Sequence, residues 1–222
     1  MSIDRFILAS GSPRRKELLE QIGINPEIIP SDIDEKVTTS VPGELVISLS
    51  KSKAMDISSK LQLPERTEDI SLTTGTPECS ENMSPAASHQ DKITLILGAD
   101  TVVSVDGHIL GKPHSHEEAA EMIRSIRGRS HQVYTGVTII AGDSTGQTSI
   151  DSFAVKTDVN VYPMTEEEIR TYSESAEPMD KAGAYGIQGT FARYIKGIEG
   201  DYNNVVGLPV AEVYQRIKKY MI

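Results

Sequence analysis

Three segments of the chain carry side chains suited to chemistry on phosphates, and the first is SGSPRR at residues 10–15. Its pattern predicts a helix that begins at Pro13 with Ser12 as N-cap. A helix start offers unpaired N–H groups and a favourable dipole to an anion, and Arg14 and Arg15 suit bidentate phosphate contacts. The segment predicts either a phosphate site or an ordinary capped helix with two solvated arginines. Spacing alone favours the capped helix.

The second segment is GADT at residues 98–101, which follows the apolar run 93–97. A carboxylate at a strand end is held rigidly and suits a metal ligand or a base that activates water, which makes Asp100 a candidate. Taken alone, Asp100 is more simply a turn residue that binds local N–H groups. The acidic run at residues 32–35 offers a further oxygen ligand, although such runs are usually solvated.

The third segment is DKAGAYGIQG at residues 180–189. Its three glycines indicate close backbone approach or unusual dihedral angles, and Gln188 has both a donor and an acceptor for the edge of a base. A tight structural loop explains the glycines equally well. Lys53 and Lys112 are further cations, and each by itself is most simply a surface lysine.

Several classes of protein are disfavoured. The sequence lacks the GxxxxGK[ST] and GxGxxG phosphate loops, the kinase signatures, the GxSxG elbow and any Cys/His metal spacing. The net charge of −10 disfavours binding to a nucleic-acid polymer, but it is compatible with one small anion held by local cations. A single cysteine, Cys79, gives no intramolecular disulfide, and no apolar run approaches the roughly 20 residues of a membrane span. We therefore expect a cytoplasmic protein without membrane contact.

The elements that must position these segments alternate between strand and helix, which predicts an α/β fold. Helices are predicted from Pro13 to a stop at Gly23, over 42–61, after capping boxes at Ser115 and Thr165, and over 209–221. Strands are predicted over 5–9, 93–97, 102–105, 108–110, 131–141 and 150–161, with a hairpin turn at Asp106-Gly107. Residues 64–92 are rich in Ser, Thr and Pro, carry six acidic and two basic residues, and are predicted to be a flexible insertion in a single domain spanning 1–222.

These segments occur in the order found in one family. The chain resembles the Maf family of nucleoside triphosphate pyrophosphatases, which is related in fold to the inosine triphosphatase group. The resemblance rests on LASGSPRR (8–15), GADT (98–101), GKP (111–113), DKAGAYGIQG (180–189), GDY (200–202) and NVVGLP (204–209). Apart from 64–92, it covers nearly the whole chain.

The resemblance implies an α/β fold in which a mixed sheet with flanking helices forms two lobes around a cleft, commonly in a homodimer. It also implies hydrolysis of a nucleoside triphosphate to the monophosphate and pyrophosphate with a divalent cation, Mg²⁺ or Mn²⁺. The DKAGAYGIQG form is similar to the branch that acts on dTTP and UTP. Two alternatives remain, a 7-methyl-GTP pyrophosphatase and a noncatalytic nucleotide-binding regulator of cell division.

The resemblance also implies roles for individual residues. Asp100 matches the catalytic proton acceptor, and Glu35 matches an acidic site residue that helps Asp100 to hold the metal. Lys53 and Lys112 complete the catalytic group. The residues matched to substrate binding are Ser10, Arg14, Arg15, Thr101 and Gln188, of which Arg14, Thr101 and Gln188 are associated with substrate choice.

Overall fold

The computed structural model describes residues 2–34, 39–63, 92–143 and 145–221. Glu35 and residues 64–91 of the predicted insertion lie outside these ranges, whereas Lys92 is the first residue of a strand. The strands are β1 (Ser2–Leu8), β2 (Glu27–Ile28), β3 (Lys92–Val105), β4 (His108–Leu110), β5 (Ser130–Asp143), β6 (Thr148–Val161) and β7 (Ile195–Glu199). The α-helices are α1 (Pro13–Gln21), α2 (Pro42–Lys60), α3 (His116–Ile126), α4 (Glu166–Ser173), α5 (Tyr202–Val206) and α6 (Val210–Ile217). The short 3-10 helices are η1 (Glu177–Asp180), η2 (Ala182–Ala184), η3 (Thr190–Tyr194) and η4 (Lys218–Tyr220).

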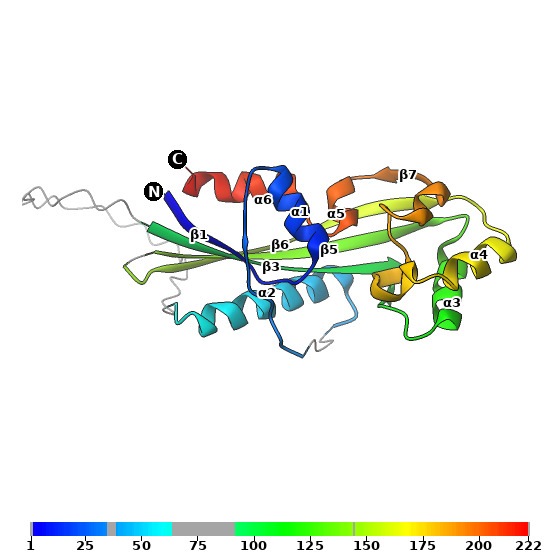
Figure 1. The fold of residues 1–222 in the computed structure, drawn as a ribbon, viewed down its shortest axis with the longest axis horizontal. Coiled ribbons are helices and arrows are strands. Elements are labelled where there is room, and N and C mark those ends of the chain that lie inside the picture. Colours follow the sequence, from blue (N-terminus) through cyan, green and yellow to red (C-terminus); the bar gives the residue numbers. More distant parts are fainter. Residues whose placement is uncertain (1, 35–38, 64–91, 144, 222) are drawn as a thin grey trace, which may run out of the picture.

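The strands of the described ranges form one mixed sheet of seven, in the order β2-β1-β3-β5-β6-β7 with β4 beside β3. The β1 strand pairs in parallel with β2 and β3, and the remaining pairs are antiparallel. Figure 1 shows α2 on one face of this sheet and α1, α5 and α6 on the other, with α3 and α4 together at one end. The predicted mixed sheet with flanking helices is therefore confirmed.

Side chains alternate along β3 between two apolar layers, as the period of a strand requires. Ile96 is fully buried among Ala54 and Ile57 of α2, whereas Leu95 and Leu97 join the larger core on the opposite face. Burial of each such side chain contributes about 1.5–3 kcal/mol to folding. Both faces of β3 are covered, which explains its nearly continuous apolar sequence.

Most local signals in the sequence are confirmed. Thr165 and Glu168 form both bonds of the capping box, and Asp106 and Gly107 have φ values of 51° and 78° in the β3–β4 hairpin. Ser115 accepts a hydrogen bond from the Glu118 amide, but the Glu118 carboxylate accepts from the His114 amide, so only one bond of the predicted capping box at Ser115 is present. At α1, Pro13 is the first helical residue, but Ser12 makes no side-chain cap, and its amide instead donates to Ser10 Oγ at 3.3 Å.

The structure differs from the prediction at three places. The predicted strands 93–97 and 102–105 are one strand, β3, so the GADT segment lies within a strand and not in a turn after one. The predicted helix 209–221 is α6 followed by η4. Short elements with no clear period, including β2, β7 and α5, were not predicted. No helix within the described ranges is long and apolar enough to cross a membrane.

Candidate active site

One cavity of about 750 Å³ collects the described residues that the sequence singled out. Its lining residues come from the start of α1, from α2 and β3, and from residues 180–189. Its lining includes Ser10, Arg14, Arg15, Lys53, Asp100, Thr101, Lys112 and Gln188. Glu35, the remaining candidate, lies outside the described residues.

The cavity opens where β3 loses one neighbour. Pairing with β1 ends at Leu97, and pairing with β4 begins at Val103, so the stretch 98–102 follows the end of β1 and precedes the hairpin. The ends of strands are common ligand sites in α/β sheets. The side chains of Asp100 and Thr101 reach this cavity from opposite faces of the sheet because successive residues of a strand alternate.

Asp100 pairs with Lys53 across the face covered by α2. The Lys53 Nζ atom lies 2.6 Å from Asp100 Oδ1, and both side chains are largely buried. Gly98 allows this approach: a Cβ atom there would overlap the carbonyl oxygen of Ser50 and lie 2.9 Å from the amide nitrogen of Ala54. The glycine of the GADT segment therefore serves the contact between helix and strand, and not a turn.

Thr101 joins a hydrogen-bond network on the opposite face. The Arg15 guanidinium donates to Thr101 Oγ1 at 3.1 Å, to Ser10 Oγ at 3.0 Å and to the Gly207 carbonyl at 2.9 Å. Thr101 Oγ1 lies 2.9 Å from Thr135 Oγ1, which donates to the buried carbonyl of Asn204. Arg15 therefore ties α1 to β3 and to the end of α5, a structural task that the sequence did not indicate.

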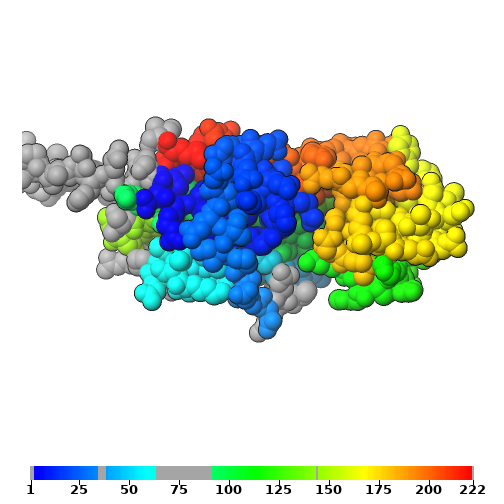
Figure 2. Space-filling view, viewed as in Figure 1, coloured from blue at the N-terminus to red at the C-terminus, as the bar shows by residue number. Residues whose placement is uncertain are grey.

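Arg14 has a different environment from Arg15. It is about one-third exposed, and its guanidinium lies 3.9 Å from the Asp180 carboxylate. This ion pair crosses between the blue surface of α1 and the gold surface of the segment that contains Asp180, which meet in Figure 2. Lys112 is exposed in the stretch between β4 and α3. Arg14 and Lys112 are therefore more accessible to an incoming anion than the largely buried Lys53.

The cavity also contains residues that the sequence did not single out. Lys181 lines it beside Gln188, and one wall is apolar. The apolar wall consists of Leu45, Leu49, Val102 and Ile109, which pack together. Since these side chains follow ordinary core periodicity, no pattern in the sequence distinguishes a cavity wall from a core. An apolar wall beside polar groups suits an organic ring attached to a charged tail.

A buried polar pair stands behind the cavity. His131 Nε2 lies 2.7 Å from the hydroxyl of Tyr185, which lines the cavity. Burial lowers the pKa of His131 from 6.5 to about 4, and the Asp158 carboxylate offsets only part of this shift. Burial raises the pKa of Tyr185. Both side chains are therefore neutral at pH 7, and they act as packing groups with one fixed hydrogen bond.

The charges of the lining suit a polyanion. The described lining residues include more cationic side chains than carboxylates. The cations are Arg14, Arg15, Lys53, Lys112 and Lys181, and the carboxylates are Asp100 and Asp180. No group of three or more His, Cys, Asp or Glu residues forms a metal cluster in the described part of the chain. Mg²⁺ usually binds through one or two carboxylates together with substrate phosphates and waters, so a site with Asp100 as carboxylate donor fits such an ion.

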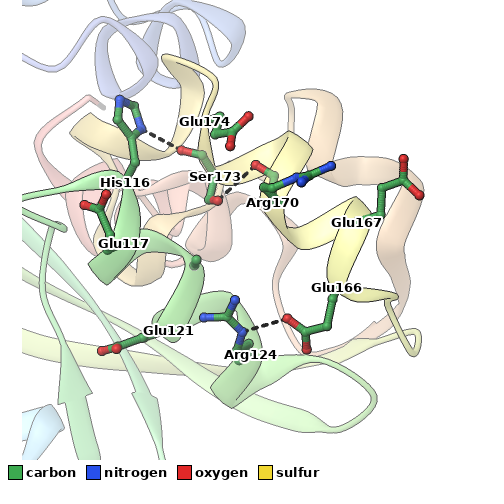
Figure 3. A pocket seen from close by; sticks show the side chains of 10 residues that line it. His116, Glu117, Glu121, Arg124, Glu166, Glu167, Arg170, Ser173 and Glu174 are labelled. Carbon is green, nitrogen blue, oxygen red and sulfur yellow. Dashed lines mark hydrogen bonds and ion pairs between the residues drawn. The ribbon is translucent and has the colours of Figure 1, made fainter.

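A second cavity of about 690 Å³ lies in a groove between α3 and α4. Figure 3 shows its lining, in which Arg124 binds Glu166 and His116 Nδ1 contacts the Ser173 carbonyl at 2.6 Å. Its other charged lining residues are Glu117, Glu121, Glu167, Arg170 and Glu174. None of the residues predicted for chemistry lies in this groove.

Fold and site together define an α/β protein with a cavity rich in cationic side chains beside one buried carboxylate. The chain belongs to the Maf family, since the family model described as Maf-like protein matches residues 5–220.

The chain is also similar over nearly its full length to curated bacterial proteins. It is 46% identical over 217 residues to a protein of Agathobacter rectalis named dTTP/UTP pyrophosphatase, with 98% of each chain covered. It is 42% identical to a protein of the same name from Carboxydothermus hydrogenoformans, with 97% of this chain and 98% of the relative covered. A third, from Lachnoclostridium phytofermentans, is 41% identical, with 98% and 96% covered.

Proposed function

We propose that this protein hydrolyses dTTP and UTP to the nucleoside monophosphate and pyrophosphate. The observation that carries the proposal is the Lys53–Asp100 pair within a cavity that is otherwise rich in cations. Relatives that are 41–46% identical carry the name dTTP/UTP pyrophosphatase, which supports the choice of substrate.

Different residues of the chain neutralise the phosphate charge and accept the proton. Arg14, Lys112 and Lys53 offset the charge of the phosphates, and Asp100 accepts a proton from the attacking water. The water oxygen forms a bond to the α-phosphorus, the bond from that phosphorus to the bridging oxygen breaks, and pyrophosphate leaves. Asp100 suits this task because β3 holds its backbone and α2 holds its partner.

A divalent cation, Mg²⁺ or Mn²⁺, completes the proposal. Asp100, with Glu35 as the resemblance implies, would hold it together with the substrate phosphates. When bound, the cation supplies Lewis-acid neutralisation of the charge that develops on the phosphate oxygens. Arg15 and Ser10 keep the start of α1 in place for this arrangement through their mutual hydrogen bond.

Base selection is assigned to Gln188 and the apolar wall of the cavity. Gln188 presents an amide that can both donate to and accept from the edge of a pyrimidine, and the apolar wall with Leu45 and Leu49 suits the flat faces of the ring. Thr101 and Arg14 join Gln188 in substrate choice, as the resemblance implies. A homodimer in the cytoplasm, without membrane or nucleic-acid partners, is part of the same proposal.

The test is a panel of dTTP, UTP, CTP and 7-methyl-GTP in the presence of Mg²⁺ or Mn²⁺, with monophosphate and pyrophosphate quantified. Faster turnover of dTTP and UTP with stoichiometric pyrophosphate is expected. A clear preference for 7-methyl-GTP would assign the protein to that other activity. Tight nucleotide binding without pyrophosphate release would favour the noncatalytic regulator.

A further inference from the structure

Gln188 is carried on a short turn whose two ends are glycines. The Gly189 amide donates to the Gly186 carbonyl at 3.1 Å, which closes the turn 186–189. Gln188 is exposed and lines the cavity, whereas Ile187 beside it is buried. The direction of the Gln188 side chain therefore depends on what holds the two ends of this turn.

One carboxylate holds the end of the turn that follows Gly189. Glu177 Oε2 accepts hydrogen bonds from the Thr190 amide at 2.8 Å and from Thr190 Oγ1 at 2.7 Å. Glu177 Oε1 accepts from the Phe191 amide at 3.4 Å and from the Tyr172 hydroxyl at 3.1 Å. A single side chain thus fixes two consecutive backbone amides and joins them to α4.

Tyr172 supports the Glu177 carboxylate. Its hydroxyl donates to Glu177 Oε1 at 3.1 Å and joins the carboxylate to α4. Glu177 and Tyr172 together therefore hold the end of the turn that follows Gly189, and we call these two residues the clamp.

The glycines of the turn are explained by the same contacts. A Cβ atom at Gly189 would overlap the Glu177 carboxylate, and one at Gly186 would lie 2.8 Å from Lys181 Cε. The turn packs directly against η1 and the residue that follows it, and no side chain fits between them. The glycine spacing noted in the sequence serves this packing.

Glu177 remains ionised while it holds the turn. Burial by itself would raise the pKa of Glu177, but the hydrogen bonds from Thr190, Phe191 and Tyr172 outweigh it and lower the pKa below its ordinary value. Glu177 stands behind the cavity: the described lining on this side consists of residues 180–182 and 185–189. Its effect on a ligand must pass through the turn.

We propose that Glu177, together with Tyr172, is a positioning residue that sets base selectivity by fixing the turn that carries Gln188. This inference rests on the proposed function, in which Gln188 meets the base. A polar group discriminates between bases only when it is held in one place, because a mobile amide can adapt to either pattern of donors and acceptors. A clamped turn meets that condition.

The experiment compares Glu177→Gln with the matched control Glu167→Gln, an exposed glutamate of α4 that lies in the α3–α4 groove. The new amide group at residue 177 faces donors, so the turn loses at least one bond. We expect KM for dTTP and UTP to rise about tenfold, with a smaller change for CTP and little change in kcat. Inhibition by pyrophosphate, which has no base, should be unchanged, as should every parameter of Glu167→Gln.

A second variant, Thr190→Ala, removes one donor to Glu177 and leaves the carboxylate in place, so a smaller change in the same direction is expected. Amide hydrogen exchange over residues 186–191 should rise in Glu177→Gln alone among the two glutamate variants. Faster exchange with an unchanged KM and an unchanged ratio of dTTP to CTP use would overturn the positioning role, although hydrolysis by the wild type would still support the proposed function.

The two proposals fail separately. If the wild-type protein hydrolyses no nucleoside triphosphate, the proposed function is wrong, and the clamp is then judged by calorimetric binding of dTTP and pyrophosphate. Weaker binding of dTTP by Glu177→Gln, with pyrophosphate binding unchanged, supports the clamp. Equal affinities of the variant and the wild type for dTTP would overturn it.

Discussion

The Nζ atom of Lys53 on α2 lies 2.6 Å from Oδ1 of Asp100 in the middle of β3. The two residues are 47 positions apart in the sequence, and both side chains are nearly closed off from solvent. In a largely buried ion pair, the attraction between the charges offsets the cost of removing them from water only when their geometry is well fixed. Here the close contact of α2 with Gly98 fixes it.

The first prediction concerns Asp100 itself. Asp100→Asn keeps the shape of the side chain but cannot accept the proton of water, so turnover of dTTP should fall about 10²–10⁴-fold. Pyrophosphate release gives the rate, and calorimetry gives nucleotide affinity, which should be retained. Asp180→Asn, the other carboxylate of the described lining, is the control and should keep most of its turnover. Near-normal turnover by folded Asp100→Asn would refute the assignment.

A second prediction separates the two neighbouring arginines. Arg15→Lys loses the fork that reaches Ser10, Thr101 and Gly207, so the free energy of unfolding should fall by about 1–3 kcal/mol. Arg14→Lys should change stability by less than about 0.5 kcal/mol because its pair with Asp180 is long and exposed. It should instead raise KM for dTTP. Urea unfolding and steady-state kinetics on both variants check this, and equal losses of stability would contradict it.

A third prediction tests the contact between α2 and β3. Gly98→Ala places a methyl group against the Ser50 carbonyl, so α2 must shift, at a cost of about 1–3 kcal/mol. Lys53 lies between Ser50 and Ala54 on that turn of the helix, so activity should fall as well. Gly43→Ala, in the first turn of α2 with open space around it, is the control and should be neutral or stabilise by about 0.5 kcal/mol. Urea unfolding measures both, and an unchanged midpoint for Gly98→Ala would argue against the tight contact.

The fourth prediction concerns pH and His131. Its pKa in the folded protein is about 4, whereas the unfolded chain titrates near 6.5, so the unfolded state binds more protons between these values. The stability due to neutral His131 is therefore complete above about pH 6.5 and is lost as the pH falls toward 4, by up to about 3 kcal/mol.

The measurement is urea unfolding at pH 7 and at pH 4 for the wild type and for His131→Phe, which keeps an aromatic ring beside Tyr185. Carboxylates that do not interact with His131 contribute equally to both proteins, so the difference between their pH dependences reports on His131 and its partner Asp158. Parallel losses of stability in the two proteins would show that His131 binds its proton as readily in the folded protein as in the unfolded chain, which would contradict the lowered pKa.

Local elements of the fold were predictable because short-range patterns determine them. The capping box of Thr165, the hairpin turn at Asp106 and the start of α1 at Pro13 each depend on a few consecutive residues. The boundary after residue 97 was wrong because glycine in a strand resembles a turn when its neighbours in space are unknown. Only the approach of α2 shows why Gly98 continues a strand.

For the site, the sequence by itself determined which segments matter, since several ordered motifs matched one family. The tertiary structure decided which residues of these segments are open to the cavity and which are bound within the fold. Arg14 and Arg15 are adjacent and identical in type, yet Arg14 faces the cavity rim beside Asp180 whereas Arg15 is bound within the fold by Ser10 and Thr101. One residue rotates a helical side chain by about 100°, so neighbours in sequence face different surroundings.

The meeting of Lys53 with Asp100, and the clamp of Glu177 on the turn of Gln188, were likewise decided by the tertiary structure alone. No local pattern encodes them, because each depends on the distance between two packed elements. That distance is set by the absence of a side chain at Gly98 and at Gly189. The glycines are visible in the sequence, but what fills the space beside them is visible only in the fold.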